Sequence, residues 1–248
     1  MLYTRKIFSI FAGLVLAATA VLSAQAKTSA PGGMSGASVL EKTQLQEPLD
    51  LAILIQDNLV SRVGNEMGVT RDFILSLPEG SRVMVGYIST GSLQVRQPFT
   101  TNLQEAARAL RTPRANASVS SFNPYVEVIE ALRKFESGGT NRNALLLISD
   151  GLDISRGFDV SSSLNSLDLE RAIREAKRRR VAVYSFYAPS VGLTSQNVTA
   201  ILFGQGSLNR LSDETGGRAF FQGNSFVAFD SYFDRLRETL NAQYARAY

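Results

Sequence analysis

Four runs of mainly apolar residues recur along the chain and predict buried strands. They are LDLAILIQ from Leu49, RVMVGYIS from Arg82, NALLLIS from Asn143 and VAVYSFY from Val181. Each run has the length of a strand and is rich in Val, Ile, Leu or Tyr. Because the apolar residues are nearly continuous rather than alternating, we expect these strands to be covered on both faces, as in a parallel sheet.

Helical periodicity separates the strands. Apolar residues three and four apart predict helices in SRVGNEMGVTRDFILSL, NLQEAARALR, YVEVIEALRKF, LDLERAIREAKRRR and FVAFDSYFDRLRETLNAQY. A turn at Thr90-Gly91-Ser92 followed by the alternating LQVRQPF predicts one antiparallel edge strand, and RAFFQ after Gly216-Gly217 predicts a short sixth strand. The pattern therefore predicts an α/β fold, a Rossmann-like, doubly wound and mostly parallel six-stranded sheet.

The first 47 residues read differently from the rest. Arg5 and Lys6 precede the apolar run IFSIFAGLVLAATAV and the small-residue end Ala24-Gln25-Ala26, which predicts a secretory signal peptide over residues 1–26. An uncleaved anchor is the alternative. Residues 27–47 are rich in Gly, Ser, Ala and Thr and predict a flexible leader, so the folded domain is expected at 48–248. We expect an exported protein, periplasmic or secreted, with no integral membrane segment after cleavage.

Composition narrows the chemistry. The chain has no Cys, His or Trp, and the lack of Cys and His excludes disulfides, Ser-His-Asp catalysis and His-ligated zinc. Loss of Arg5 and Lys6 with the signal peptide leaves 24 of the 26 basic residues against 22 acidic ones, a balance that favours no nucleic-acid partner. Oxygen-bearing side chains remain, and these are ligands for hard cations such as Mg²⁺.

Two carboxylates follow strands of the expected sheet. Asp57 and Asn58 come directly after the first strand, and Asp150 comes directly after NALLLIS. The carboxyl ends of parallel strands meet at one edge of a sheet, where open α/β sheets bind ligands. Two carboxylates brought together there either bind a cation or raise a pKa. The alternative interpretation is that they only cap the following helices and loops.

Four segments carry a resemblance to a known family. They are LDLAILIQD, VMVGYISTGSLQVRQPFT, ALLLISDGLD and LSDETGGRAFFQG, in this order along the chain. Together they resemble a von Willebrand factor A-like (vWA) domain, in particular the bacterial, exported group, over essentially residues 48–248. The resemblance implies the vWA fold and binding of a protein partner at the loops that follow the strands.

The resemblance also implies a candidate metal site. Many vWA domains carry a metal-ion-dependent adhesion site, formed by Asp-x-Ser-x-Ser, a Thr before a middle helix, and the Asp of SDG. The matching positions here are Asp57, Ser61, Ser121 (or Ser120) and Asp150, whereas Leu59 stands where the central Ser is expected. Because Mg²⁺ requires near-octahedral oxygen coordination, Leu59 predicts a degenerate site with at most weak binding of Mg²⁺ or another divalent cation.

Three functions follow. The first is an exported, non-catalytic interaction module with an unidentified protein partner. The alternative is a cation-dependent adhesion domain that uses Asp57, Ser61 and Asp150, and a remote alternative is a carboxylate-based hydrolase.

The segments 152–168 and 188–207 are expected as long loops on the binding edge. Disorder is the alternative for the first segment, and a covering lid is the alternative for the second. The basic run Lys177-Arg178-Arg179-Arg180 is expected as the last turn of a helix, with an anionic-lipid or nucleic-acid patch as the alternative.

Overall fold

The computed structural model describes residues 44–120, 123–136, 138–158, 166–221 and 228–247. All of them belong to one compact unit. The predicted signal peptide lies outside these residues, as does most of the predicted leader. The end of that leader contacts the last helix, because the Asn241 side chain donates to the Gln44 carbonyl at 2.8 Å and accepts from the Gln46 N–H at 3.3 Å.

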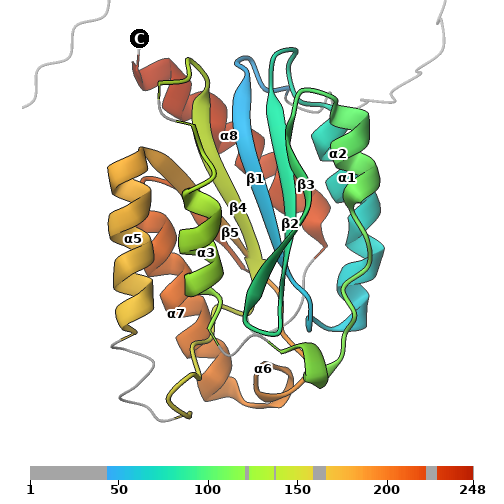
Figure 1. Cartoon of the computed structure of the whole chain (residues 1–248), viewed down its shortest axis with the longest axis vertical. Helices are drawn as coiled ribbons and strands as arrows, with labels where there is room; N and C mark the ends of the chain where they lie inside the picture. Colours follow the sequence, from blue (N-terminus) through green and yellow to red (C-terminus); the bar gives the residue numbers. More distant parts are fainter. Residues whose placement is uncertain (1–43, 121–122, 137, 159–165, 222–227, 248) are drawn as a thin grey trace, which may run out of the picture. The chain divides into compact units, whose positions relative to one another are not determined.

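A six-stranded sheet forms the centre of the domain (Figure 1). Its strands are β1 (Leu49–Gln56), β2 (Arg82–Ser89), β3 (Ser92–Thr100), β4 (Arg142–Ser149), β5 (Val181–Tyr187) and β6 (Ala219–Phe220). Their order is β3-β2-β1-β4-β5-β6, and every neighbouring pair is parallel except β2 and β3. The predicted fold, including the antiparallel edge strand, is confirmed.

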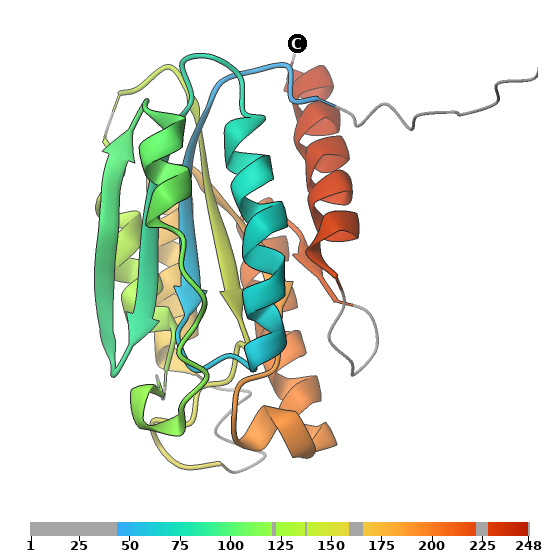
Figure 2. The same cartoon turned by 90° about the vertical axis from the view of Figure 1, so that its right-hand side faces the viewer.

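Helices cover both faces of the sheet. The helical segments are η1 (Ser61–Glu66), α1 (Met67–Leu75), α2 (Leu103–Ala109), η2 (Ala117–Val119), α3 (Tyr125–Leu132), α5 (Leu167–Arg179), α6 (Leu193–Gln196), α7 (Val198–Glu214) and α8 (Phe229–Ala247). One core packs α1, α2 and α8 against the sheet, and the other packs α3, α5 and α7. Figure 2 shows α1 (cyan) and α8 (red) on the same side of the sheet.

The strand β1 explains why the apolar runs are continuous. Leu51, Ile53 and Ile55 enter the first core, whereas Ala52 and Leu54 enter the second. Successive side chains of a strand point to opposite faces, so a strand between two helical layers needs apolar residues at every position. All five side chains are at most 1% exposed.

The segment 188–207 differs from its prediction as a loop. Leu193–Gln196 form α6, and every residue of this segment beyond Asn197 belongs to α7, which begins at Val198. The Asn197 side chain caps α7 by accepting from the Ala200 N–H at 3.0 Å. Gly204 and Gly206 concealed the helix in the sequence, because glycine interrupts apolar periodicity and lowers helix propensity.

No helix in the described part of the chain is both long and apolar enough to span a membrane.

Candidate functional site

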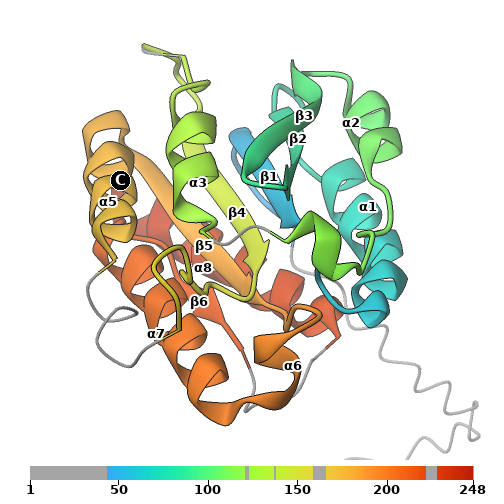
Figure 3. The ribbon, with the colours of Figure 1, turned by 60° about the horizontal axis from the view of Figure 1, so that its bottom comes forward.

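The carboxyl ends of β1, β2, β4 and β5 lie at one edge of the domain, the lower edge in Figure 1, which Figure 3 brings forward. Asp57 follows β1 and Asp150 follows β4. These two strands are adjacent and parallel, with Ile55 paired to Ile148. The sequence therefore located both carboxylates at the same edge, although each has its own set of partners.

Asp57 is fully buried and is neutralised by arginine. The Arg111 guanidinium donates from Nη1 to Oδ1 at 2.6 Å and from Nη2 to Oδ2 at 2.9 Å. The Arg114 N–H adds a bond to Oδ1 at 3.0 Å, and Arg114 Nε lies 3.4 Å from Oδ2. Such a two-pronged pair between guanidinium and carboxylate is among the stronger polar contacts in proteins. Both carboxylate oxygens are thus occupied by positively charged groups of the chain itself.

Tyr87 holds Arg111 in place. Its hydroxyl accepts from the Arg111 N–H at 2.7 Å and donates to the Arg111 carbonyl at 2.6 Å. The guanidinium carbon lies 4.0 Å from the centre of the Tyr87 ring, within range of a cation–π interaction. Because Tyr87 belongs to β2, the segment after α2 is fixed to the sheet through one side chain.

The charge state of Asp57 follows from these contacts. Burial by itself would raise the pKa of this carboxyl, but the hydrogen bonds from Arg111 and Arg114 and their charges outweigh burial and lower the pKa below its ordinary value. Arg111 keeps its proton for the same reason, since the bond to Asp57 raises the pKa of its guanidinium. Asp57 and Arg111 form a stable ion pair over the whole neutral range.

Asp150 has a different environment. Its Oδ1 accepts from the Leu152 N–H at 3.1 Å, and its Oδ2 accepts from the Thr194 hydroxyl at 3.2 Å. Thr194 in turn accepts from the Ser190 N–H at 2.8 Å. Burial raises the pKa of Asp150, and the hydrogen bonds from Ser190, Leu152 and Thr194 offset burial only in part. The main cause of the raised pKa of Asp150 is thus desolvation, whereas from the sequence we expected the like charge of Asp57 to raise it.

Gly151, directly after Asp150, is required by the backbone. Its φ is +68°, a conformation that favours glycine, and a Cβ there would meet the Gly204 carbonyl oxygen and Leu208 Cγ at 2.5 Å each. A Cβ on Gly204 would lie 2.0 Å from the Asp150 carbonyl oxygen. The loop after β4 and helix α7 therefore touch backbone to backbone, which only two glycines permit.

A chain of polar side chains connects the ends of β1 and β4. Gln56 Oε1 accepts from the Ser149 hydroxyl at 2.5 Å and from the Asp150 N–H at 3.2 Å. Gln56 Nε2 donates to Asn58 Oδ1 at 2.8 Å, and Asn58 Nδ2 donates to the Ser120 hydroxyl at 3.2 Å. Ser120, the alternative to Ser121 in the expected site, thus contacts Asn58.

The remaining positions of the expected site are described only in part. Leu59 is fully buried in the first core and Ser61 is exposed at the start of η1, while Ser121 lies outside the described residues. Among the residues that the structure describes, no three Asp, Glu, His or Cys side chains are grouped closely enough to hold a metal ion. With the Asp57 oxygens held by Arg111 and Arg114, the arrangement does not fit a metal-ion-dependent adhesion site as it stands. Metal ligation at these positions stays a prediction for the experiments below.

Sequence reasoning missed Arg111 and Arg114. Arg111 is the last residue of the predicted helix NLQEAARALR, but α2 ends at Ala109, so Arg111 lies with Arg114 in the irregular segment that follows. Nothing in the spacing of these two arginines along the sequence relates them to Asp57.

Solved structures with a similar fold include a von Willebrand factor type A protein and two proteins from Bacteroides species. BatB from Bacteroides thetaiotaomicron is 11% identical, with a TM-score of 0.54 over 80% of this chain and 99% of that protein. An aerotolerance-related membrane protein from Bacteroides fragilis is 11% identical, with a TM-score of 0.52 over 78% of this chain and 99% of that one. A von Willebrand factor type A protein from Catenulispora acidiphila is 15% identical, with a TM-score of 0.53 over 78% of this chain and 43% of that one.

These similarities identify the fold as vWA-like, in agreement with the resemblance inferred from the sequence. No protein-family model and no curated protein sequence matches the chain.

Proposed function

We propose that the protein is an exported, non-catalytic interaction module of the vWA type, which binds a protein partner at the carboxyl edge of its sheet without requiring a divalent cation. The ion pair between Asp57 and Arg111 carries this proposal. In the adhesion sites that the resemblance implies, a metal ion supplies the positive charge beside this aspartate. Here the chain supplies that charge itself, so the site is degenerate as a metal site while its charge pattern is retained.

The exposure of the Arg114 side chain supports the carboxyl edge of the sheet as the binding surface. The Arg114 side chain is 53% exposed, whereas that of Arg111 is 24% exposed and Asp57 is fully buried. Two guanidinium groups against one carboxylate leave one positive charge, and Arg114 presents it to solvent. A polar group of a partner is able to reach this charge without displacing the buried pair.

A non-catalytic role rests on the chemistry of the same edge. The chain contains no His and no Cys, and Asp57 is committed to Arg111. Asp150 is nearly fully buried, which disfavours a role as a general acid in contact with substrate. Hydrolysis that is lost on Asp150→Asn would contradict this part of the proposal.

Export rests on residues 1–26, whose pattern predicts a signal peptide. The match described as a membrane protein from Bacteroides fragilis is consistent with a location in the cell envelope. Detection of the mature chain starting at Lys27 in the periplasm or medium would test this step.

Site-specific crosslinking tests the binding edge and its cation independence together. A photo-crosslinking residue is placed at Arg62, which is exposed at the edge and is not one of the expected ligands, and at Arg174 on the exposed side of α5 as a matched control. We expect a partner adduct from position 62 that persists in EDTA, and no such adduct from position 174. An adduct that EDTA abolishes would instead favour the cation-dependent adhesion domain using Asp57, Ser61 and Asp150. An adduct from position 174 alone would show that binding takes place elsewhere.

A further inference from the structure

A basic pocket lies at the opposite edge of the sheet, where the parallel strands begin. Its volume is about 490 Å³, and it lies between the start of β4, the loop after α3 and the end of α5. Arg142, Arg178, Arg179 and Arg180 line it, and Glu136 is the only acidic residue of the lining. The last three arginines belong to the basic run at the end of α5, and their role is not explained by binding at the carboxyl edge.

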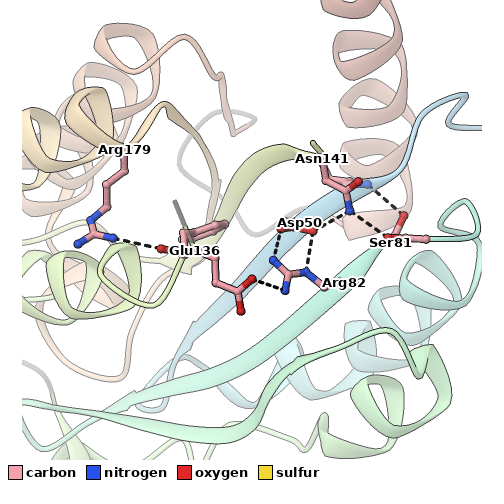
Figure 4. Close-up of polar contacts among 9 residues, drawn as sticks. Asp50, Ser81, Arg82, Glu136, Asn141 and Arg179 are labelled. Carbon is pink, nitrogen blue, oxygen red and sulfur yellow. Dashed lines mark hydrogen bonds and ion pairs between the residues drawn. The ribbon is translucent and has the colours of Figure 1, made fainter. Parts of the chain in front are cut away.

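Nearby carboxylates neutralise part of this charge. Glu175 pairs with both Arg178 and Arg179 at 2.6 Å. Glu136 pairs with Arg82 at 2.9 Å, and Arg82 is bound to Asp50 at 2.6 Å as well. Figure 4 shows Arg82 between these two carboxylates, with Asn141 on the other side of Asp50. The four arginines of the lining together with Arg82 contribute five positive charges, and Asp50, Glu136 and Glu175 contribute three negative ones. The net charge of the group is therefore +2.

Arg178 and Arg179 share the single charge of Glu175, whereas Arg142 and Arg180 pair with no carboxylate in the described part of the chain, so the excess positive charge lies among these four groups. Arg142 donates to the Leu240 carbonyl at 2.9 Å and to Gln243 Oε1 at 3.0 Å, both of which are neutral acceptors. Arg180 is exposed, ends α5 with a φ of +55°, and has no ion pair with a carboxylate in the described part of the chain. The basic last turn predicted from the sequence is confirmed for residues 177–179, but complementing a helix end does not account for these two cations.

Two glycines of the loop after α3 line the other side of the pocket. Gly138 and Gly139 belong to its lining and carry no side chains that would fill it. Asn141 fixes the end of this loop by donating to Asp50 Oδ1 at 2.8 Å and to the Gly80 carbonyl at 2.9 Å. Arg179 fixes its beginning by donating to the Phe135 carbonyl at 3.2 Å. The cavity is therefore bounded by anchored groups.

We propose that this pocket binds a phosphate-bearing ligand. Guanidinium groups bind phosphate oxygens in a two-pronged geometry and remain charged at every physiological pH. The volume falls within the range of small-molecule sites, about 300 to 1,000 Å³. The phosphate comes either from a soluble phosphate ester or diphosphate or from the headgroup of an anionic lipid. This site is independent of the partner-binding edge.

Calorimetry with pyrophosphate tests the proposal, using the protein without residues 1–26. The test variant is Arg178→Gln with Arg180→Asn, because Asn tolerates the left-handed backbone of position 180. The control variant, Arg171→Gln with Arg174→Gln, removes the same charge from α5 outside the pocket lining. Arg142 is left unchanged, since its bonds to α8 make it part of the packing. A second arm measures co-sedimentation with phosphatidylcholine vesicles with and without phosphatidylglycerol.

We expect one pyrophosphate to bind per chain. Its affinity should fall at least about tenfold in the test variant, because two charge-assisted contacts are lost, and should be unchanged in the control. Binding to phosphatidylglycerol vesicles alone, with the same dependence on the two variants, would identify the lipid headgroup as the source. Equal weakening in both variants would reveal attraction by net charge only and would overturn the proposal. Absence of binding in both arms would overturn it as well.

Discussion

Replacing Arg111 by Met tests the central feature of the candidate site. Met has a similar length and retains packing against Tyr87, but it removes both guanidinium bonds to Asp57. Asp57 is then a fully buried carboxylate that keeps only the contacts from Arg114. The variant therefore separates the charge of Arg111 from its volume.

The expected loss of stability is large. Removing one partner of a buried ion pair costs about 3 to 5 kcal/mol, because the other charge remains desolvated. The Arg111 side chain is 24% exposed and Arg114 remains nearby, so we expect the lower end, about 3 kcal/mol at pH 7. For a domain of this size that corresponds to a thermal midpoint lower by about 6 to 12 °C.

The dependence on pH gives the sharper test. In the wild type the pKa of Asp57 is below its ordinary value of 3.8, so the pair contributes stability above that value, which is lost as the pH falls through the folded pKa. In Arg111→Met burial dominates and raises the pKa, so the variant loses stability as the pH rises above 3.8. The difference between the two proteins must therefore be small near pH 3 and grow toward pH 7.

Urea unfolding at several pH values between 3 and 7 measures this difference. Arg108→Met, an exposed arginine on α2, is the control and should stay close to the wild type. Asp57→Asn in the Arg111→Met background should recover part of the loss, because it removes the unpaired charge. A loss below about 1 kcal/mol that does not change with pH would refute the reasoning.

Three other variants test separate parts of the structure. Glu127 is 2% exposed, its Oε2 has no hydrogen-bond partner in the described structure, and burial raises its pKa to about 6. Wild-type stability should therefore fall as the pH rises through about 6, and Glu127→Gln should remove this dependence when thermal unfolding is compared at pH 5 and 7.5. An unchanged dependence in the variant would assign it to another group. Gly151→Ala should lower the free energy of unfolding in urea by about 2 kcal/mol or more, because it adds a steric clash to a positive φ. Gly157→Ala is the control and should lower it less, since Gly157 has a φ of +88° but nothing within 4 Å of its Cβ. Equal losses would contradict the clash. Leu59→Ser restores the sequence pattern of the adhesion site but should lower the free energy of unfolding by about 2 to 4 kcal/mol, because Leu59 packs in the core. The variant should show no calorimetric signal with Mg²⁺, since Arg111 still holds Asp57, and a Mg²⁺ signal would favour the adhesion alternative.

Local pattern predicted most of the fold. The central strands were evident because strands covered on both faces need apolar residues at every position, as β1 illustrates. The edge strand β3 was evident from its turn and its alternation. Helix α7 was not, because its buried face includes Gly204 and Gln205, which carry no apolar signal. Gly204 is required by its approach to the Asp150 carbonyl, a contact between residues 54 positions apart.

The candidate site was predictable only in part. The positions of Asp57 and Asp150 follow from strand topology, which a sequence pattern encodes. The partners of Asp57 do not, because Arg111 reaches it from an irregular segment fixed by Tyr87 of a neighbouring strand. The charge state of each carboxyl depends on such long-range contacts, so the opposite pKa directions of the two aspartates were beyond the sequence.

The contact between Arg111 and Tyr87 has a consequence for how the edge responds to its surroundings. A metal ion is an exchangeable component, so its occupancy follows the ion concentration of the medium and is lost to chelators. A guanidinium tied to the sheet by the chain has an effective concentration that dilution does not change. We therefore expect the charge beside Asp57 to be the same in ion-poor and ion-rich media, and under the proposed function partner binding at this edge should not depend on the metal supply.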